Sequence, residues 1–140
     1  MKELLRKLNY KGQKRIAVLN SAELFLKDLH EALEGVIIDT EIDQRCPYEF
    51  MIIFVKNRTE VKQTAPVALH NLTADGILWF CYRKKSSLKF RPDLERDNGW
   101  EVLQEAGFYG IRMVSVDDEW SALRFRNRKF IKSKSGRIPT

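Results

Sequence analysis

Short apolar runs alternate with amphipathic stretches along this chain, which predicts β-strands alternating with α-helices. Two runs are apolar at every position, from Phe50 to Val55 and from Ile77 to Tyr82. Strands that are apolar on both faces are typical of a parallel sheet covered by helices on two sides. Shorter apolar runs predict four further strands, at residues 15–19, 36–40, 111–116 and 120–126. The pattern therefore predicts an α/β fold whose sheet is parallel at its centre.

Apolar residues at helical spacing predict the first two helices. One short helix is expected near the N-terminus, over residues 4–8, and a longer one over residues 22–33. Asn20 or Ser21 is the expected N-cap of the longer helix. Glu23, three residues after Asn20, completes a capping-box pattern there.

A third apolar stripe predicts a helix that begins at Asn57 and continues to Leu72. Asn57 and Glu60 again form a capping pattern. Pro66 interrupts the stripe, so either two short helices meet there or one helix is kinked. A last short helix is expected from Gly99 to Ala106.

Three polar segments predict turns and one long loop. Asp75-Gly76 is expected to turn the chain into the strand that starts at Ile77. Residues 83–98 are irregular and polar, and a connection of that length in a small domain is usually functional or mobile. The segment Asp117-Asp118-Glu119 is expected to form a tight turn rather than a metal or general-base cluster, because turns favour aspartate for local hydrogen bonds.

Composition indicates a single domain. The chain has 140 residues, of which 44% are hydrophobic, so residues 1–140 are expected to share one core, with a basic tail at 127–140. No apolar run approaches the roughly 20 residues of a membrane span, and the N-terminus lacks the apolar stretch of a signal peptide. We therefore expect a cytoplasmic protein that does not contact a membrane. Cys46 and Cys81 fit neither a redox nor a zinc spacing, so we expect reduced thiols and no metal.

The positive charge is concentrated in three segments. The formal net charge is +6, and residues 1–15, 83–91 and 124–137 hold six, five and seven of the 25 basic residues. Residues 16–82 carry ten acidic and five basic side chains. A basic balance of this kind either solvates the surface or attracts an acidic partner.

Part of the chain resembles known families. The run Asp75-Gly-Ile-Leu-Trp-Phe80, the turn Ala106-Gly-Phe108 and the segment from Arg112 to Arg124 follow in an order similar to the C-terminal half of class I S-adenosylmethionine methyltransferases. They also resemble a family of small uncharacterised bacterial proteins with a domain of unknown function. The resemblance covers about residues 49–126. It implies a truncated methyltransferase-like fold: a Rossmann-like three-layer sandwich with a six-stranded, mostly parallel sheet of order 2-1-3-4-6-5 and strand 6 antiparallel.

The cofactor site that this resemblance implies is altered. The enzymes have a glycine-rich turn after strand 1, which lets the backbone approach the ligand, whereas this chain has Asn20-Ser-Ala-Glu23. Asp39 or Glu41 resembles the acid that binds ribose after strand 2. Without the glycines we expect no cofactor.

No catalytic arrangement is complete in the sequence. It has neither a Gly-x-Ser-x-Gly elbow nor a recognisable cysteine–histidine pair. His30 and His70 lie near predicted helix ends, where a cation complements the helix dipole, so structural roles are expected. Trp79 and Trp100 are expected in the core, and base stacking stays open only for Trp120. Enzymatic activity therefore stays an open question, and the sequence favours a non-catalytic protein.

The basic residues are the better functional candidates. Period-two alternation sets Arg124 and Arg126 on one face of the last strand. Together with Lys84 and Lys85, which follow the predicted strand from Ile77 to Tyr82, they form one positive surface if the topology brings them together. The leading hypothesis is that this loop and the basic tail bind a polyanion, such as a nucleic acid, or an acidic protein.

Two other hypotheses belong to different classes. The first is an enzyme or sensor of a small anionic nucleotide at the carboxyl ends of the strands, near Asn20, Ser21, Lys56 and Lys84. The second is a self-associating scaffold. A pocket outside the carboxyl ends of strands 1 and 3 would favour the small-ligand hypothesis.

Overall fold

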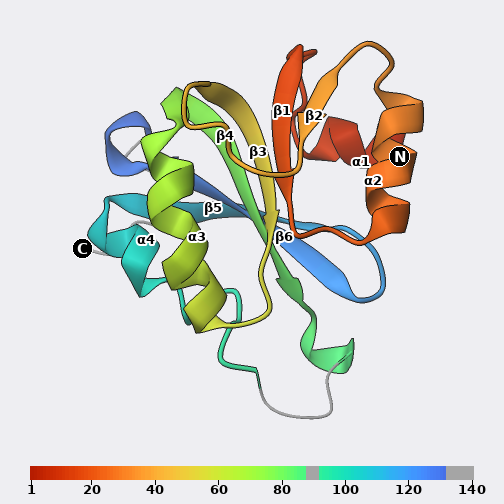
Figure 1. Cartoon of the computed structure of the whole chain (residues 1–140). Coiled ribbons are helices and arrows are strands. Elements are labelled where there is room, and N and C mark those ends of the chain that lie inside the picture. The colour runs from red at the N-terminus through yellow and green to blue at the C-terminus, as the bar shows by residue number, and fades with distance from the viewer. Residues whose placement is uncertain (88–91, 132–140) are drawn as a thin grey trace.

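Six strands form one sheet, and its two central strands contain the runs that are apolar at every position (Figure 1). The computed structural model describes residues 1–87 and 92–131. The strands are β1 (Arg15–Leu19), β2 (Ile37–Asp39), β3 (Tyr48–Phe54), β4 (Leu72–Arg83), β5 (Phe108–Ser115) and β6 (Trp120–Asn127). The helices are α1 (Lys2–Lys7), α2 (Glu23–Ala32), α3 (Arg58–His70) and α4 (Glu101–Glu105), with short 3-10 turns η1 (Lys85–Ser87) and η2 (Arg128–Phe130).

The strand order is β2-β1-β3-β4-β6-β5, which confirms the order that the sequence resemblance implies. Strands β1 to β4 run parallel to one another, whereas β6 is antiparallel to both of its neighbours, β4 and β5. Trp79 in β4 pairs with Ile52 in β3 and with Arg124 in β6. The carboxyl end of β4 therefore lies beside the start of β6, at Trp120.

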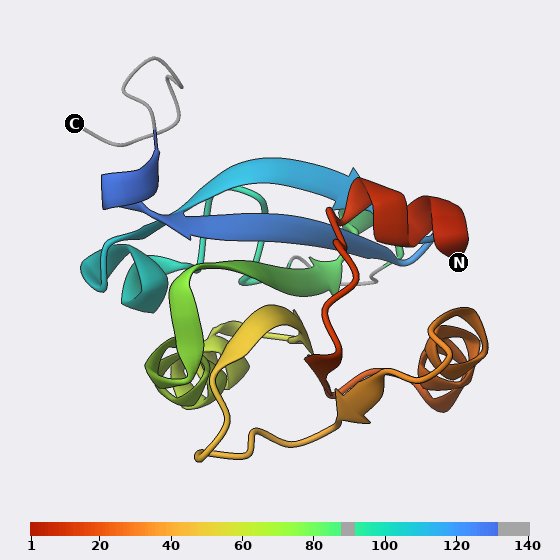
Figure 2. The same cartoon turned by 90° about the horizontal axis from the view of Figure 1, so that it is seen from above.

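Helices cover both faces of the sheet, which makes the three-layer sandwich (Figure 2). One cluster of buried residues joins α1 and α2 to one face, here called the α1 face. A second cluster joins α3 and α4 to the other, here called the α3 face. Trp79 is fully buried on the α1 face and Trp100 is buried on the α3 face, so both are core residues as predicted.

The start of β4 differs from the prediction. Asp75-Gly76 does not precede the strand but lies inside it, because β4 begins at Leu72. Asp75 has φ +55°, and the pairing with β3 slips between Tyr48–Leu72 and the next pair. A Cβ atom at Gly76 would lie 2.7 Å from Leu72 Cδ1, so any larger residue would require the Leu72 side chain to move. The pair forms an irregularity within the strand rather than a turn before it.

The two predicted helix caps have opposite outcomes. Asn57 caps α3 as expected, since its Oδ1 accepts from the Glu60 backbone N–H at 2.9 Å. Pro66 lies inside this single helix. The predicted cap of α2 is wrong, because the N-cap is Ala22 and no side chain caps it. Asn20 has φ +61°, whereas an N-cap residue adopts an extended backbone.

The C-terminal third follows the prediction in outline. Strand β5 begins at Phe108, three residues earlier than expected, and α4 is shorter than the predicted helix. The turn at Asp117 is confirmed: its Oδ1 accepts from the backbone N–H groups of Glu119 and Trp120, each at 2.8 Å. The predicted basic tail is described only as far as residue 131, and residues 88–91 of the predicted long loop also lie outside the described residues.

Candidate functional site

The turn after β1 occupies the place where the resemblance implies a cofactor. Asn20 is exposed, and its side-chain amide donates to the carbonyl of Phe54 at 3.4 Å. Phe54 in turn meets the rings of Phe25 and Trp120, with ring centroids 5.1 Å apart in each pair. Trp120 therefore belongs to an aromatic row at this edge, where the guanidinium of Arg83 also lies 5.5 Å from its ring.

Asn20, Ser21 and Lys56 do not line any of three surface hollows that described residues form, at the end of β4, beside β2 and beside α1. The small-ligand hypothesis placed its site near these three residues and Lys84. Of the residues named for it, only Lys84 lines one of these hollows.

Asp39, one candidate for the ribose-binding acid, is held by other protein groups. Its carboxylate accepts from Arg15 Nε at 2.7 Å and from the hydroxyl of Tyr48. Burial and the hydrogen bond to Asp39 raise the pKa of Tyr48 to about 12. The hydrogen bond with Asp39 also raises the pKa of Arg15. The carboxylate therefore ties β2 to the starts of β1 and β3.

Lys84 and Lys85 lie at the carboxyl end of β4. Lys84 Nζ donates to Ser115 Oγ at 2.7 Å and to the carbonyl of Asp117 at 2.6 Å, so the side chain ties β4 to the β5–β6 hairpin. Lys85, in η1, forms an ion pair with Glu95 at 3.3 Å. Ser115 follows Val114, which packs on the α1 face, so alternation along β5 places Ser115 and Lys84 on the α3 face.

Arg124 and Arg126 lie on the opposite side of the sheet. The residues that alternate with them in β6, Leu123 and Phe125, are buried on the α3 face, so both arginines are on the α1 face. The structure therefore does not bring Arg124 and Arg126 together with Lys84, and the expected single positive surface is divided by the sheet. The sequence showed that Arg124 and Arg126 share one face of their strand. It did not show that Lys84, after β4, lies on the other face of the sheet.

Arg126 is paired with a carboxylate. Its Nε and Nη2 donate to the two oxygens of Asp75, each at 2.7 Å. The hydrogen bond from Arg126 lowers the pKa of Asp75, and the reciprocal bond raises the pKa of Arg126. Two parallel hydrogen bonds of this kind are the strongest geometry for an arginine–carboxylate pair.

Arg124 has a different environment. Its side chain is about half buried, and its Nε atom is buried without a hydrogen-bond partner among the described residues. Burial lowers the pKa of Arg124, and the nearby charge of Arg126 lowers it further. Arg112 on β5 lies directly across from Arg124 and also lowers this pKa. We call Arg112, Arg124 and Arg126 the arginine row.

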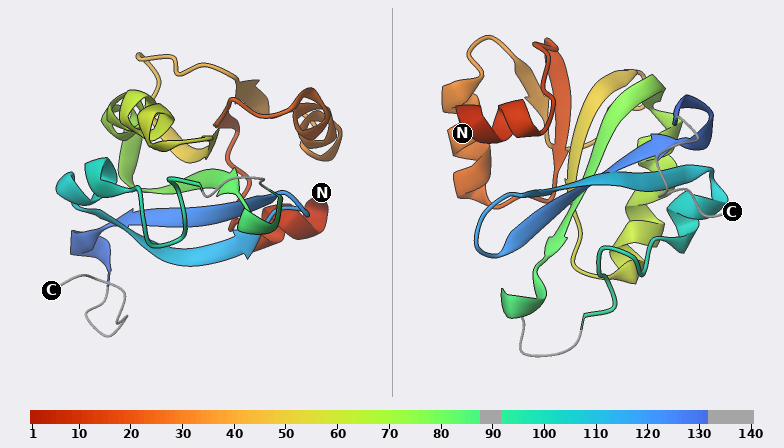
Figure 3. Two further views of the ribbon diagram at one scale, coloured as in Figure 1. Left: turned by 90° about the horizontal axis from the view of Figure 1, so that it is seen from below. Right: turned by 180° about the vertical axis from the view of Figure 1, so that it is seen from behind.

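Sequence reasoning missed Arg112, although the signal was present. Arg112 lies in the predicted strand before the hairpin, and antiparallel pairing through the Asp117 turn brings it beside Arg124. The view from behind shows that α1 and β5 lie on the same side of the molecule (Figure 3, right). The arginine row lies on this side, where η2 adds Arg128 and Lys129 directly after β6.

The histidines, the buried cysteine and the possible metal ligands were also candidates for function. His30 and His70 lie in the last turns of α2 and α3. Cys81 is fully buried, which raises the pKa of its thiol. Within residues 1–87 and 92–131, no three His, Cys, Asp or Glu side chains are grouped so that they could hold a metal ion. No helix in this described part is long and apolar enough to cross a membrane.

The comparisons place the fold among known structures. No protein-family model and no curated protein matches this sequence. Among solved structures, the fibrillarin pre-rRNA processing protein of Methanococcus jannaschii matches with a TM-score of 0.55 and 12% identity, over 84% of this chain and 68% of that one.

Two further matches have a TM-score of 0.50. A putative type 11 methyltransferase from Sulfolobus solfataricus is 14% identical over 91% of this chain and 90% of that one. A SAM-dependent methyltransferase from Aquifex aeolicus is 16% identical over 89% and 87%. The structural neighbours are thus class I methyltransferases, and at these identities the likeness extends to the Rossmann-like fold alone.

Proposed function

We propose that this protein is a non-catalytic binding protein that holds a polyanion, such as the phosphate backbone of a nucleic acid, on its arginine row. The observation that carries the proposal is the half-buried guanidinium of Arg124, whose buried Nε has no hydrogen-bond partner among the described residues. A buried donor without an acceptor costs free energy, so the Arg124 side chain would gain by turning outward to a phosphate oxygen.

The charges around Arg124 support an anionic partner. Arg112 is exposed on the neighbouring strand, and Arg126 lies two residues along β6. The nearby carboxylate of Asp75 partly offsets these charges at Arg124, but it is already bonded to Arg126. Like charges that gather on one strand pair destabilise the free protein, and a bound anion would relieve that repulsion.

The composition of the C-terminus extends this charge along the chain. Arg128 and Lys129 are exposed directly after β6. The sequence continues with Lys132, Lys134 and Arg137. Guanidinium groups bind phosphate in a planar, two-point geometry, which favours phosphate over less directional anions.

An S-adenosylmethionine-dependent transferase has less support. The fold of the neighbours favours it, but Asp39 is bonded to Arg15 and Tyr48, and the turn after β1 carries the side chain of Asn20. A methyl-transfer function would require both features to rearrange.

Fluorescence anisotropy with labelled DNA and RNA oligonucleotides at several salt concentrations tests the proposal. We expect binding without strong sequence preference and an affinity that falls steeply as salt rises, because counterions are released. Replacing Arg112 and Arg124 by Gln should lower the slope of log affinity against log salt by about two units on duplex DNA, since each lost phosphate contact removes about 0.9.

A matched control loses the same charge elsewhere. Arg45 lies in the loop before β3 and Lys62 lies on α3, and both are exposed. Replacing these two by Gln should leave the salt slope unchanged. Absence of binding at low salt, or an equal effect of the two double variants, would overturn the proposal. If polyglutamate competes as well as the oligonucleotides do, an acidic protein replaces the nucleic acid as the partner.

A further inference from the structure

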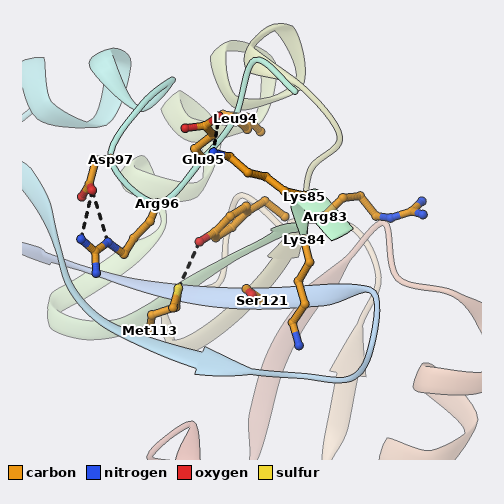
Figure 4. Close-up of a pocket in the computed structure, with 10 residues that line it drawn as sticks. Arg83, Lys84, Lys85, Leu94, Glu95, Arg96, Asp97, Met113 and Ser121 are labelled. Carbon is orange, nitrogen blue, oxygen red and sulfur yellow. Dashed lines mark hydrogen bonds and ion pairs between the residues drawn. The ribbon is translucent and has the colours of Figure 1, made fainter. Parts of the chain in front are cut away.

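A hollow of about 450 Å³ opens on the α3 face where β4 ends (Figure 4). Its walls come from β4, the start of η1, residues 94–97, β5 and β6. This volume falls within the roughly 300–1,000 Å³ of pockets that bind small molecules. We infer that this space, here called the β4 hollow, binds a small organic anion with an apolar body.

The floor of the β4 hollow is apolar and firmly held. It is formed by Tyr82, Leu94 and Met113. The Tyr82 ring packs against Trp100, with centroids 5.7 Å apart, and its hydroxyl donates to the sulfur of Met113 at 3.2 Å. Met113 is 46% exposed although it is a large apolar side chain, so its open surface is available to an apolar group.

The rim of the β4 hollow carries fixed positive charge. Hydrogen bonds to Ser115 and Asp117 hold the Lys84 ammonium in one place at the rim. Figure 4 shows Arg96 on the other side of Met113, with its guanidinium bonded to Asp97 at 3.1 Å. A pair of exposed neighbouring residues of this kind is weak, so the Arg96 guanidinium can exchange its partner for an anionic ligand.

The balance of charges favours an anion over a cation. The two acidic side chains in the wall, Glu95 and Asp97, each form an ion pair with a wall residue, Lys85 and Arg96. Lys84 also lines the hollow and adds a further positive charge. An anionic group at the rim with its apolar part on the floor satisfies both surfaces, as in pockets with few, well-placed polar groups.

This inference does not rest on the proposed function. The β4 hollow lies on the α3 face, whereas the arginine row lies on the α1 face, and they share no residue. A compact hollow of this volume fits a small molecule, while an open row of arginines fits an extended polymer. The two sites can therefore be tested with separate variants.

Nuclear magnetic resonance titration of the ¹⁵N-labelled protein with phenyl phosphate tests the inference. We expect saturable shifts at the amides of Tyr82, Leu94 and Met113, with a dissociation constant of about 1 mM or below. Inorganic phosphate and benzyl alcohol each supply half of the ligand, so both should bind at least about tenfold more weakly.

The variants avoid Lys84, because its loss would also loosen the hairpin. Arg96→Gln and Met113→Gln should each weaken phenyl phosphate binding about five- to tenfold. The matched controls Arg45→Gln and Leu24→Gln change an arginine and a large apolar residue at exposed positions outside the hollow and should leave the affinity unchanged.

Three results would overturn the inference. They are the absence of saturable shifts up to about 10 mM, shifts centred on Arg112 and Arg124, and equal affinities for the test and control variants. Replacing Arg112 and Arg124 by Gln should leave the shifts around Met113 unchanged. Oligonucleotide binding is measured separately with that double variant, so a failure here leaves the proposed function standing and the reverse also holds.

Discussion

Arg126 and Asp75 join the last strand to the irregular start of β4 through two hydrogen bonds of 2.7 Å each. The two residues are 51 positions apart, and the bond holds Asp75 at a position with φ +55°. The same contact neutralises one arginine of the arginine row. It therefore stabilises the fold and limits the charge available to an anion.

We expect Asp75→Asn to cost about 0.5–1 kcal/mol at pH 7, because the pair is partly exposed. Asparagine tolerates a positive φ, so the backbone preference is kept. The hydrogen bond from Arg126 lowers the pKa of Asp75, so the stabilisation is present above the unfolded value of 3.8 and is lost as pH falls through the folded value. Urea denaturation should show the difference between wild type and variant at pH 7 and a smaller one at pH 3. An equal difference at both would contradict this account.

Replacing Trp79 by Ala should cost about 3–5 kcal/mol. Trp79 is fully buried, and its indole N–H donates to the carbonyl of Leu8 at 2.8 Å, which links α1 to the sheet. Trp79→Phe should cost less, since most of the ring is retained and the hydrogen bond is lost. Leu24 is 68% exposed, so Leu24→Ala should stay within about 0.5 kcal/mol of wild type. Urea denaturation measures all three.

Tyr48 should make stability depend on alkaline pH. Its pKa is raised from 10.0 to about 12, chiefly by burial, so the neutral phenol is favoured in the folded state. This contribution is fully present below the unfolded pKa and is lost as pH rises toward 12. We expect Tyr48→Phe to cost about 1–2 kcal/mol at pH 8, because Asp39 loses a donor. Between pH 10 and 12 the variant should lose less stability than wild type. If wild type and Tyr48→Phe lost the same free energy of unfolding across that range, this role would be refuted.

Calorimetry should detect no micromolar binding of S-adenosylmethionine. The Asp39 carboxylate is bonded to Arg15 and Tyr48, and the turn after β1, where the resemblance implies glycine, carries Asn20 at φ +61°. Asn20→Gly should fold, because glycine accepts the same positive φ. It should still not bind, since Asp39 stays engaged. A methyltransferase of known affinity serves as the positive control, and a low-micromolar dissociation constant for either form would reverse the conclusion.

The elements that were predictable from sequence are those whose signals are local. Strand β1 has the predicted bounds, and the Asn57 cap of α3 depends on residues only three positions apart. The cap of α2 was wrong because Asn20 takes a positive φ, which composition does not reveal. Asparagine suits a cap and a left-handed turn equally well, so the residue type could not decide between them.

The parts of the site that could not be predicted depend on which strands are neighbours. Asp39 meets Arg15 because β1 and β2 pair in parallel, although the residues are 24 positions apart. Arg112 joins Arg124 only through the register of the β5–β6 hairpin. Lys84 and Arg124 were expected together, but they lie on opposite faces of the sheet. Lys84 is two residues after Tyr82, which packs on the α3 face, whereas Arg124 lies between Leu123 and Phe125, which both pack on that face. Charge can be counted in a sequence, but the face it occupies is set by pairing.

We expect the Arg124 guanidinium to lower the stability of the free protein and to contribute to the binding of oligonucleotides. Its side chain is half buried beside Arg112 and Arg126, and its buried Nε has no acceptor among the described residues. Removing a poorly compensated charge while keeping the apolar stem should stabilise the fold, so we expect Arg124→Met to gain about 0.5–1 kcal/mol. The same variant should bind oligonucleotides more weakly by about fivefold or more. Arg45→Met, at an exposed side chain, should change neither property. If Arg124→Met lost stability and bound as wild type does, the guanidinium would be a structural group rather than a binding one.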